Sequence, residues 1–249
     1  MVARTIAAIE RDGQRDEVAV EEPMEIRVDG QALSVTMRTP GHDEELALGF
    51  LLGEGLIDGV RPAGLTEDLA NNFIEVGGPL TRDPSARRFY TTSSCGVCGR
   101  GSLEEVAVNA EIAAPGPVIS RDLLADLPNR LRQPGFARTG GLHATGLFTP
   151  AGELLLVRED VGRHNAMDKV IGRALRDGLL PLHDHVLCVS GRLSFELVQK
   201  AAVAGVPILV GVGAPSSLAV RLADDRNMTL CGFARGARVN VYTRADRVR

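Results

Sequence analysis

The sequence predicts an α/β protein with a small β-rich N-terminal lobe and a larger lobe of alternating strands and helices. Its 249 residues are 44% apolar and 24% charged, as expected for a globular chain. A hairpin pattern lies near the N-terminus. From residue 140 onward, short apolar runs alternate with helical periodicity, which favours a largely parallel sheet covered by helices. We expect the smaller lobe to span residues 1–100 and the larger lobe residues 101–249, joined near residues 100–115.

The N-terminal lobe begins with a predicted hairpin. Residues 24–28 and 33–37 alternate apolar and polar side chains, and Asp29-Gly30 between them is typical of a two-residue turn. After Thr39-Pro40-Gly41, acidic residues 43–45 open a helix with Leu46, Phe50 and Leu51 on one face, ending near Gly53 or Gly55. The stretch from about residue 58 to 84 shows no clear pattern, and residues 87–90 predict a short strand.

The larger lobe shows a regular alternation of elements. Strands are predicted over residues 142–148, 153–158, 185–190, 207–212, 228–233 and 238–242, and helices over residues 163–176, 193–204 and 216–224.

Charge and hydropathy exclude several classes of protein. The formal charge of −4 and the pI near 5.8 give no basic field for binding nucleic acid. No window approaches the roughly 18–20 apolar residues of a membrane span. The apolar run at residues 6–9 is too short for a secretory signal. We therefore expect a cytoplasmic protein without nucleic-acid or membrane partners.

A cysteine pair stands in a loop rich in small residues. Cys95 and Cys98 form a C-x-x-C within residues 91–101, and Ser102-x-x-Glu105 predicts a helix start just beyond it. We therefore expect the pair on a mobile loop, where Arg100 would favour the thiolate. Such a thiolate suits picking up a group at one site and delivering it at another. The other two cysteines, Cys188 and Cys231, lie in apolar runs.

Three other interpretations of the cysteine pair remain open. His42-Asp43-Glu44 followed by the C-x-x-C imitates the zinc signature of nucleobase deaminases, but Ser94 stands where the proline should be. A thioredoxin-like site would need the pair to open a helix directly. The third interpretation is a pair of ordinary exposed cysteines, but protein surfaces seldom keep such a pair without a function, because exposed thiols oxidise. We expect no bound zinc.

A second constellation runs from a predicted strand end into a helix, over residues 158–169. Asp160, His164 and Asp168 repeat every four residues, so the last two would share a helix face away from Met167 and Ile171. Ligand sites of open α/β sheets lie at such strand ends. His143 is a candidate for the same region. The alternative is a capped, solvated first turn.

Three later strand ends are rich in glycine and polar residues. They carry the following candidate ligand-binding residues: Ser190, Arg192, Gly211, Gly213, Ser216, Arg235, Gly236 and Arg238. Free N–H groups at a helix start bind anions, and paired arginines bind phosphate. Each loop alone could be a plain turn. Together the three loops indicate a ligand with a nucleotide or pyrophosphate group.

These motifs, in this order, resemble the formate dehydrogenase accessory sulfurtransferase family, FdhD. The match covers roughly residues 36–243 and includes C-G-x-C-G at residues 95–99, Glu-Asp-x-Gly-Arg-His-Asn at residues 159–165, and Gly-Phe-x-Arg-Gly at residues 232–236. Residues 1–35 and 58–84 carry no matching motif.

The resemblance implies a fold and a function. The fold would be a cytidine-deaminase-like three-layer α/β core without zinc chemistry, in a homodimer. The protein would take sulfur from a cysteine desulfurase as a persulfide on Cys95, with Cys98 as the second thiol. It would pass the sulfur to the molybdenum or tungsten bis(molybdopterin guanine dinucleotide) cofactor of formate dehydrogenase. The implied cofactor contacts, for which GDP is a fragment, are Phe233, Ala234, Arg235, Gly236, Ala237 and Arg238.

Two competing functions remain open beside the sulfurtransferase. The first is a chaperone that holds the cofactor and docks on formate dehydrogenase without obligatory sulfur transfer. The second is a zinc hydrolase of the deaminase class. The sequence does not distinguish molybdenum from tungsten or identify the desulfurase.

Overall fold

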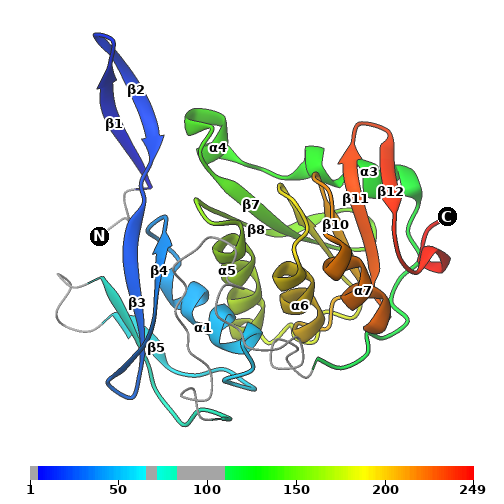
Figure 1. Ribbon diagram of the computed structural model, residues 1–249, viewed down its shortest axis with the longest axis horizontal. Helices are drawn as coiled ribbons and strands as arrows, with labels where there is room; N and C mark the ends of the chain where they lie inside the picture. Colours follow the sequence, from blue (N-terminus) through cyan, green and yellow to red (C-terminus); the bar gives the residue numbers. More distant parts are fainter. Residues whose placement is uncertain (1–4, 66–71, 83–109) are drawn as a thin grey trace.

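The computed structural model describes residues 5–65, 72–82 and 110–249, and these residues form an α/β fold (Figure 1). They contain a two-stranded hairpin, a four-stranded sheet, a six-stranded sheet and six α-helices. The predicted fold class is therefore confirmed. The boundary predicted at residue 100, the strand predicted at residues 87–90 and the C-x-x-C loop lie outside the described residues.

The six-stranded sheet has the strand order β12-β11-β10-β9-β7-β8. Its strands are β7 (His143–Phe148), β8 (Leu154–Asp160), β9 (Val186–Val189), β10 (Ile208–Gly211), β11 (Thr229–Arg235) and β12 (Arg238–Val241). Strands β9, β10 and β11 are parallel, whereas β7, β8 and β12 are antiparallel to their neighbours. The expectation of a largely parallel sheet is wrong, because the short turns before β8 and β12 leave no room for a crossover helix.

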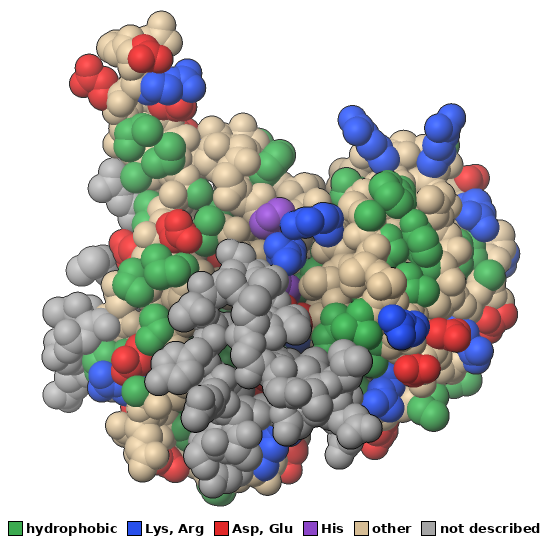
Figure 2. Space-filling model, in the orientation of Figure 1, with side chains coloured by type: hydrophobic (Ala, Val, Ile, Leu, Met, Phe, Trp, Pro, Cys, Tyr) green, Lys and Arg blue, Asp and Glu red, His purple; other side chains and the backbone are tan. Residues whose placement is uncertain are grey.

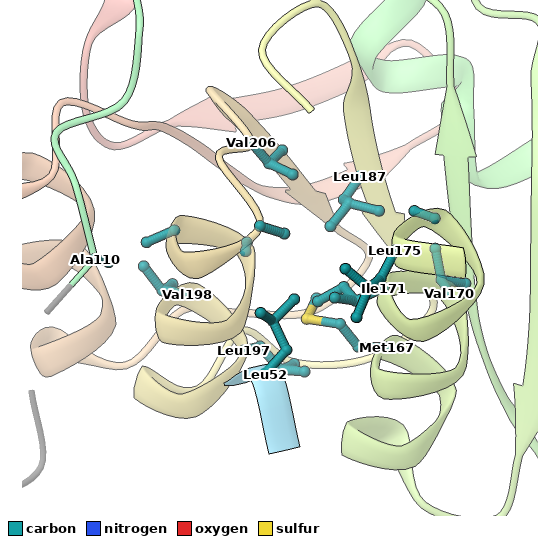
Figure 3. Close-up of a cluster of buried hydrophobic side chains, with 14 of the residues drawn as sticks. Leu52, Ala110, Met167, Val170, Ile171, Leu175, Leu187, Leu197, Val198 and Val206 are labelled. Carbon is teal, nitrogen blue, oxygen red and sulfur yellow. The ribbon is translucent and has the colours of Figure 1, made fainter. Parts of the chain in front are cut away.

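Helices cover both faces of this sheet. One face packs against α5 (Arg163–Arg176), α6 (Phe195–Val203) and α7 (Ser217–Asp225), and the other against α3 (Arg121–Arg130). Because side chains alternate along a strand, Leu187 points to the first layer and Cys188 to the second. Figure 3 shows the first layer, where Met167 and Ile171 of α5 meet Leu197 of α6. The six-stranded sheet and the helices on its two faces thus form three layers.

The four-stranded sheet has the order β4-β3-β6-β5. Its strands are β3 (Glu22–Val28), β4 (Gln31–Arg38), β5 (Ala63–Leu65) and β6 (Phe73–Val76). The predicted hairpin is confirmed, since β3 pairs antiparallel with β4 around Asp29 and Gly30, both of positive φ. In β4, however, Val35 and Met37 are exposed while Arg38 is buried.

Helix α1 (Asp43–Gly53) joins the two sheets by packing on α5. The helices touch backbone to backbone at two glycines. A Cβ on Gly49 would lie 1.9 Å from the carbonyl oxygen of Asp168, and one on Gly172 would lie 1.8 Å from that of Glu45. Only glycine permits this approach.

Several elements were not predicted. They are the hairpin of β1 (Ile6–Arg11) and β2 (Gln14–Ala19), which projects from the body in Figure 1, the strands β5 and β6, the helices α3 and α4 (Pro134–Thr139), and the 3₁₀ helix η3 (Ala245–Arg247). Most are short, and β1 and β2 carry little apolar alternation, so local pattern alone does not reveal them. Among the helices described, none combines the length and apolar character that crossing a bilayer requires.

Candidate functional site

Three loops at one edge of the six-stranded sheet lie side by side. The first two lie at the ends of β9 and β10, at residues 190–193 and 211–216, and the third comprises the last residues of β11 and the start of its turn, at residues 232–236. The N–H of Gly213 donates to the carbonyl oxygen of Gly191 at 3.0 Å, and the N–H of Phe233 donates to that of Gly213 at 3.2 Å. Together with His143 and His164, we call these loops the strand-end site. The structure therefore brings the three predicted loops together.

Several glycines and serines of these loops serve the fold itself. A Cβ on Gly211 would lie 2.7 Å from the Leu193 side chain, and one on Gly213 would lie 2.9 Å from the Arg192 Cα. The Ser216 hydroxyl accepts from the Ala219 N–H as the cap of α7. The Ser190 hydroxyl accepts from the Ala144 N–H at 2.9 Å. These side chains hold the loops in place rather than reach outward.

The turn between β11 and β12 is an exposed part of the site. Arg235 and Arg238 pair across the turn, and Gly236 has a φ of 63°. Phe233 is 48% exposed with a φ of 53°, an unusual backbone for an aromatic residue. Figure 2 shows basic side chains projecting at this edge of the molecule.

Two of the implied contact residues in this turn differ in exposure. Ala237 is exposed, whereas the Ala234 methyl is fully buried against the α3 layer. Ala234 therefore packs beneath the turn and exposes no surface of its own to a ligand.

Two histidines and two arginines meet near the start of α5. The ring of His143 lies over Gly191, where a Cβ would be 3.4 Å from its Nδ1 and 3.8 Å from the Arg163 side chain. Burial, with the charges of Arg163 and Arg192, lowers the pKa of His143. Figure 2 shows histidine beside basic side chains at the centre of the face. His143 thus belongs to the site, as the sequence suggested.

His164 is held by two residues of the α6 start. Its Nε2 lies 3.1 Å from the Ser194 hydroxyl and 3.1 Å from a Glu196 carboxylate oxygen. Burial, reinforced by the neighbouring charge of Arg163, lowers the pKa of His164 to about 3. The imidazole is therefore neutral at pH 7 and too weakly basic to act as a general base.

Asp160 points away from the strand-end site into the protein. Its carboxylate is fully buried and accepts from the N–H groups of Thr39 (3.1 Å) and Gly162 (2.8 Å) and from the Asn165 amide (3.0 Å). The Lys169 ammonium lies 2.7 Å away. Asp160 therefore ties the β8–α5 turn to the segment after β4, and its side chain has no free face for a ligand.

Asp168 is also buried, in an ion pair. Its Oδ1 lies 2.7 Å from the Lys200 ammonium of α6. Burial raises the pKa of Asp168 to about 6 although Lys200 opposes the shift. Asp168 and His164 both contact residues of the α6 segment, so they share a side of α5 as predicted, but only His164 reaches the strand-end site. Met167 and Ile171 also pack toward α6, so the expectation that the two polar residues face away from them is wrong. Sequence reasoning missed Ser194 and Glu196 at the start of α6 and Lys200 in its last turn, whose only signal was their place in a predicted helix.

The residues of the zinc interpretation have other partners. His42 Nδ1 lies 3.5 Å from a Glu45 oxygen, and Arg158 binds both Glu45 oxygens at 2.6 and 2.9 Å. Within the described ranges, no group of three histidine, cysteine or acidic side chains could hold a metal ion.

A pocket of about 870 Å³ lies apart from the strand-end loops, between the first residues of β1, the start of α1, β8 and α4. Its acidic side chains are paired within the protein, Glu44 with Arg176 and Glu45 with Arg158, and the Glu159 carboxylate accepts from the α4 N–H groups. It therefore presents no dominant charge to a ligand.

The two cysteines that the structure describes are unsuited to thiol chemistry. Cys188 and Cys231 are free and buried on the α3 face of the sheet. Burial raises the pKa of both thiols, that of Cys231 to about 12. Cys95 and Cys98 lie outside the described residues and remain the candidate reactive pair.

The fold and this site define a three-layer α/β protein with a basic, glycine-lined site at the strand ends. Comparison with known proteins places the chain more narrowly. The FdhD/NarQ family profile matches residues 19–249, and the chain belongs to the FdhD/NarQ family.

Similar proteins cover almost the whole chain. It is 53% identical to the "Sulfur carrier protein FdhD" of Streptomyces coelicolor, over 96% of this chain and 92% of that protein. It is 43% identical to the protein of the same name from Saccharolobus solfataricus, over 94% and 91%. A crystal structure from Desulfotalea psychrophila, assigned as a formate dehydrogenase accessory protein, is 26% identical with a TM-score of 0.74, over 98% and 97% of the two chains.

Proposed function

We propose that the chain is a sulfur carrier that serves formate dehydrogenase. It would receive sulfur from a cysteine desulfurase as a persulfide and transfer it to the molybdenum or tungsten bis(molybdopterin guanine dinucleotide) cofactor before insertion. The observation that carries this proposal is the family match over residues 19–249, which spans both the cysteine pair and the strand-end site. Relatives at 53% and 51% identity are named sulfur carrier proteins.

The loading step requires a reactive thiolate. The Cys95 thiolate attacks the outer sulfur of the desulfurase persulfide, the bond between the two desulfurase sulfurs breaks, and the desulfurase cysteine leaves as a thiolate. Cys95 then carries the outer sulfur. Cys98, three residues away, assists or releases it in the second transfer. The buried Cys188 and Cys231 take no part, because their thiols stay protonated.

The strand-end site supports binding of a client with pyrophosphate groups. Arg192, Arg235 and Arg238 are exposed around the three glycine loops, and guanidinium groups bind phosphate in a bidentate manner. The exposed ring of Phe233 offers a stacking surface for a base. The residues present therefore fit a guanine nucleotide.

Intact mass after incubation with a cysteine desulfurase and cysteine tests the sulfur carrier. Wild type should gain about 32 Da per sulfane sulfur, reversibly with reductant. Cys95→Ala should lose the gain, and the matched control Cys188→Ala should keep it. No gain in wild type, while the desulfurase turns over, would sink the persulfide mechanism.

A cofactor chaperone without obligatory sulfur transfer is the second candidate. The three adjoining strand-end loops favour this chaperone, because they would bind the cofactor without needing a thiol. It requires that Cys95→Ala keep formate dehydrogenase activity in cells and that Arg235→Ala abolish it. The sulfur carrier requires loss in both variants, with Arg138→Ala on α4 as the control.

The proposal includes a homodimer in the cytoplasm that binds GDP as a fragment of its client. Light scattering on the purified chain measures its mass in solution. Titration with GDP should show binding that weakens in Arg235→Ala, because one of the paired guanidinium groups is removed.

A further inference from the structure

His164 is oriented by two side chains at the start of α6. Its Nε2 lies at 3.1 Å both from an oxygen of Glu196 and from the Ser194 hydroxyl. Glu196 is buried, with 7% of its surface exposed, and lies in the first turn of the helix. The ring therefore meets a buried carboxylate through one nitrogen.

The chemistry of a carboxylate decides where the imidazole proton sits. An ionised carboxylate only accepts hydrogen bonds, so Nε2 must carry the hydrogen. Burial lowers the pKa of His164 to about 3, so the ring holds only this one proton at pH 7. Nδ1 is then left with a lone pair, as an acceptor.

We propose that Glu196 is a positioning residue that fixes the Nε2–H tautomer of His164 and leaves Nδ1 as a hydrogen-bond acceptor for the client. Arg163 and Arg192 supply positive charge beside the two histidines. An acceptor among these cations suits a ligand that carries a hydroxyl or amino donor next to a phosphate. The identity of this client rests on the proposed function, whereas the assignment of the His164 tautomer does not depend on it.

Ring ¹⁵N chemical shifts test the tautomer in the full-length chain labelled at histidine. His164→Gln assigns the signals at pH 7. Wild type should show the Nε2–H tautomer, and Glu196→Gln should shift the population toward Nδ1–H, because an amide can donate as well as accept. Glu44→Gln, which removes a carboxylate near the other end of α5, should leave the signals unchanged. An Nδ1–H or doubly protonated ring in wild type, or no shift in Glu196→Gln, overturns the proposal.

Sulfur loading and delivery separate positioning from the proposed function. Glu196→Gln should load sulfur like wild type by intact mass but lower formate dehydrogenase activity in cells about tenfold, the lower end of the loss seen when the partner that orients a metal-bound histidine is removed. Glu196→Asp, which keeps the carboxylate, should recover most of the activity. Unfolding midpoints of both variants must stay near wild type for this comparison. Unchanged delivery in folded Glu196→Gln overturns the positioning role, whereas failed loading in wild type overturns only the sulfur carrier.

Discussion

Among the described carboxylates with a shifted pKa, Glu45 has the most charged partners. Arg158 binds both of its oxygens, and His42 and Arg173 lie within 3.5 and 3.7 Å. Burial opposes ionisation, but the hydrogen bonds from His42 and Arg158 prevail and lower the pKa of Glu45 to about 2. The ionised form of Glu45 is therefore part of what stabilises the start of α1.

Replacing Glu45 should change how stability depends on pH. Because its pKa in the folded state lies below the unfolded value of 4.5, its contribution is complete above pH 4.5 and is lost as the pH falls toward 2. Glu45→Gln should cost on the order of 3 kcal/mol at pH 7 and much less at pH 3. Urea unfolding at both values measures this. Glu44→Gln, at an exposed pair, should cost under about 1 kcal/mol, and an equal cost of Glu45→Gln at both pH values would contradict the assignment.

At the scale of elements, the crossing of α1 and α5 depends on its two glycines. Alanine normally stabilises a helix relative to glycine by roughly 0.5–1 kcal/mol. At Gly172 the added Cβ would lie 1.8 Å from a backbone oxygen, so the helices must separate.

We expect Gly172→Ala to be destabilising by about 1–3 kcal/mol or more, because overpacking outweighs helix propensity. Thermal unfolding followed by circular dichroism measures the change. Gly77→Ala is the matched control, because nothing lies within 4 Å of a Cβ there. An unchanged or raised Tm for Gly172→Ala would show that the helices do not touch at this point.

The elements also show how far local patterns reach. Helix α5 begins and ends at the predicted residues, 163 and 176, because its apolar periodicity is long and regular. In β4 the alternation was correct, but the polar face is the buried one. Arg38 is buried because Asp43 and Glu22 satisfy its guanidinium. Alternation identifies two faces, whereas distant partners decide which one meets the core.

At the scale of the whole molecule, a buried ion pair connects the two sheets. Lys169 contacts Asp160 at 2.7 Å and donates to the carbonyl oxygen of Thr39 at 2.8 Å, with 1% of its side chain exposed. One apolar cluster also runs from Met24 of β3 to Leu230 of β11. The four-stranded and six-stranded sheets should therefore unfold together.

Lys169→Met should cost about 3–5 kcal/mol, because it leaves the Asp160 charge buried without its cation. Urea unfolding measures this loss, with Arg130→Met at an exposed pair as the control.

Labelling of the buried Cys188 and Cys231 should follow the same transition as circular dichroism. Labelling at a lower urea concentration would mean that the six-stranded sheet opens separately.

The sequence by itself determined the strands of the larger lobe, its helices α5, α6 and α7, the order of its motifs and the family resemblance, because regular periodicity and close-spaced motifs are local properties. Only the tertiary structure decided how the residues of one motif divide. His164 reaches the strand-end site, whereas Asp160 turns inward to Thr39, 121 residues away in the chain. The sequence of the motif does not specify this division, because a polar side chain faces inward only where the fold supplies a buried partner.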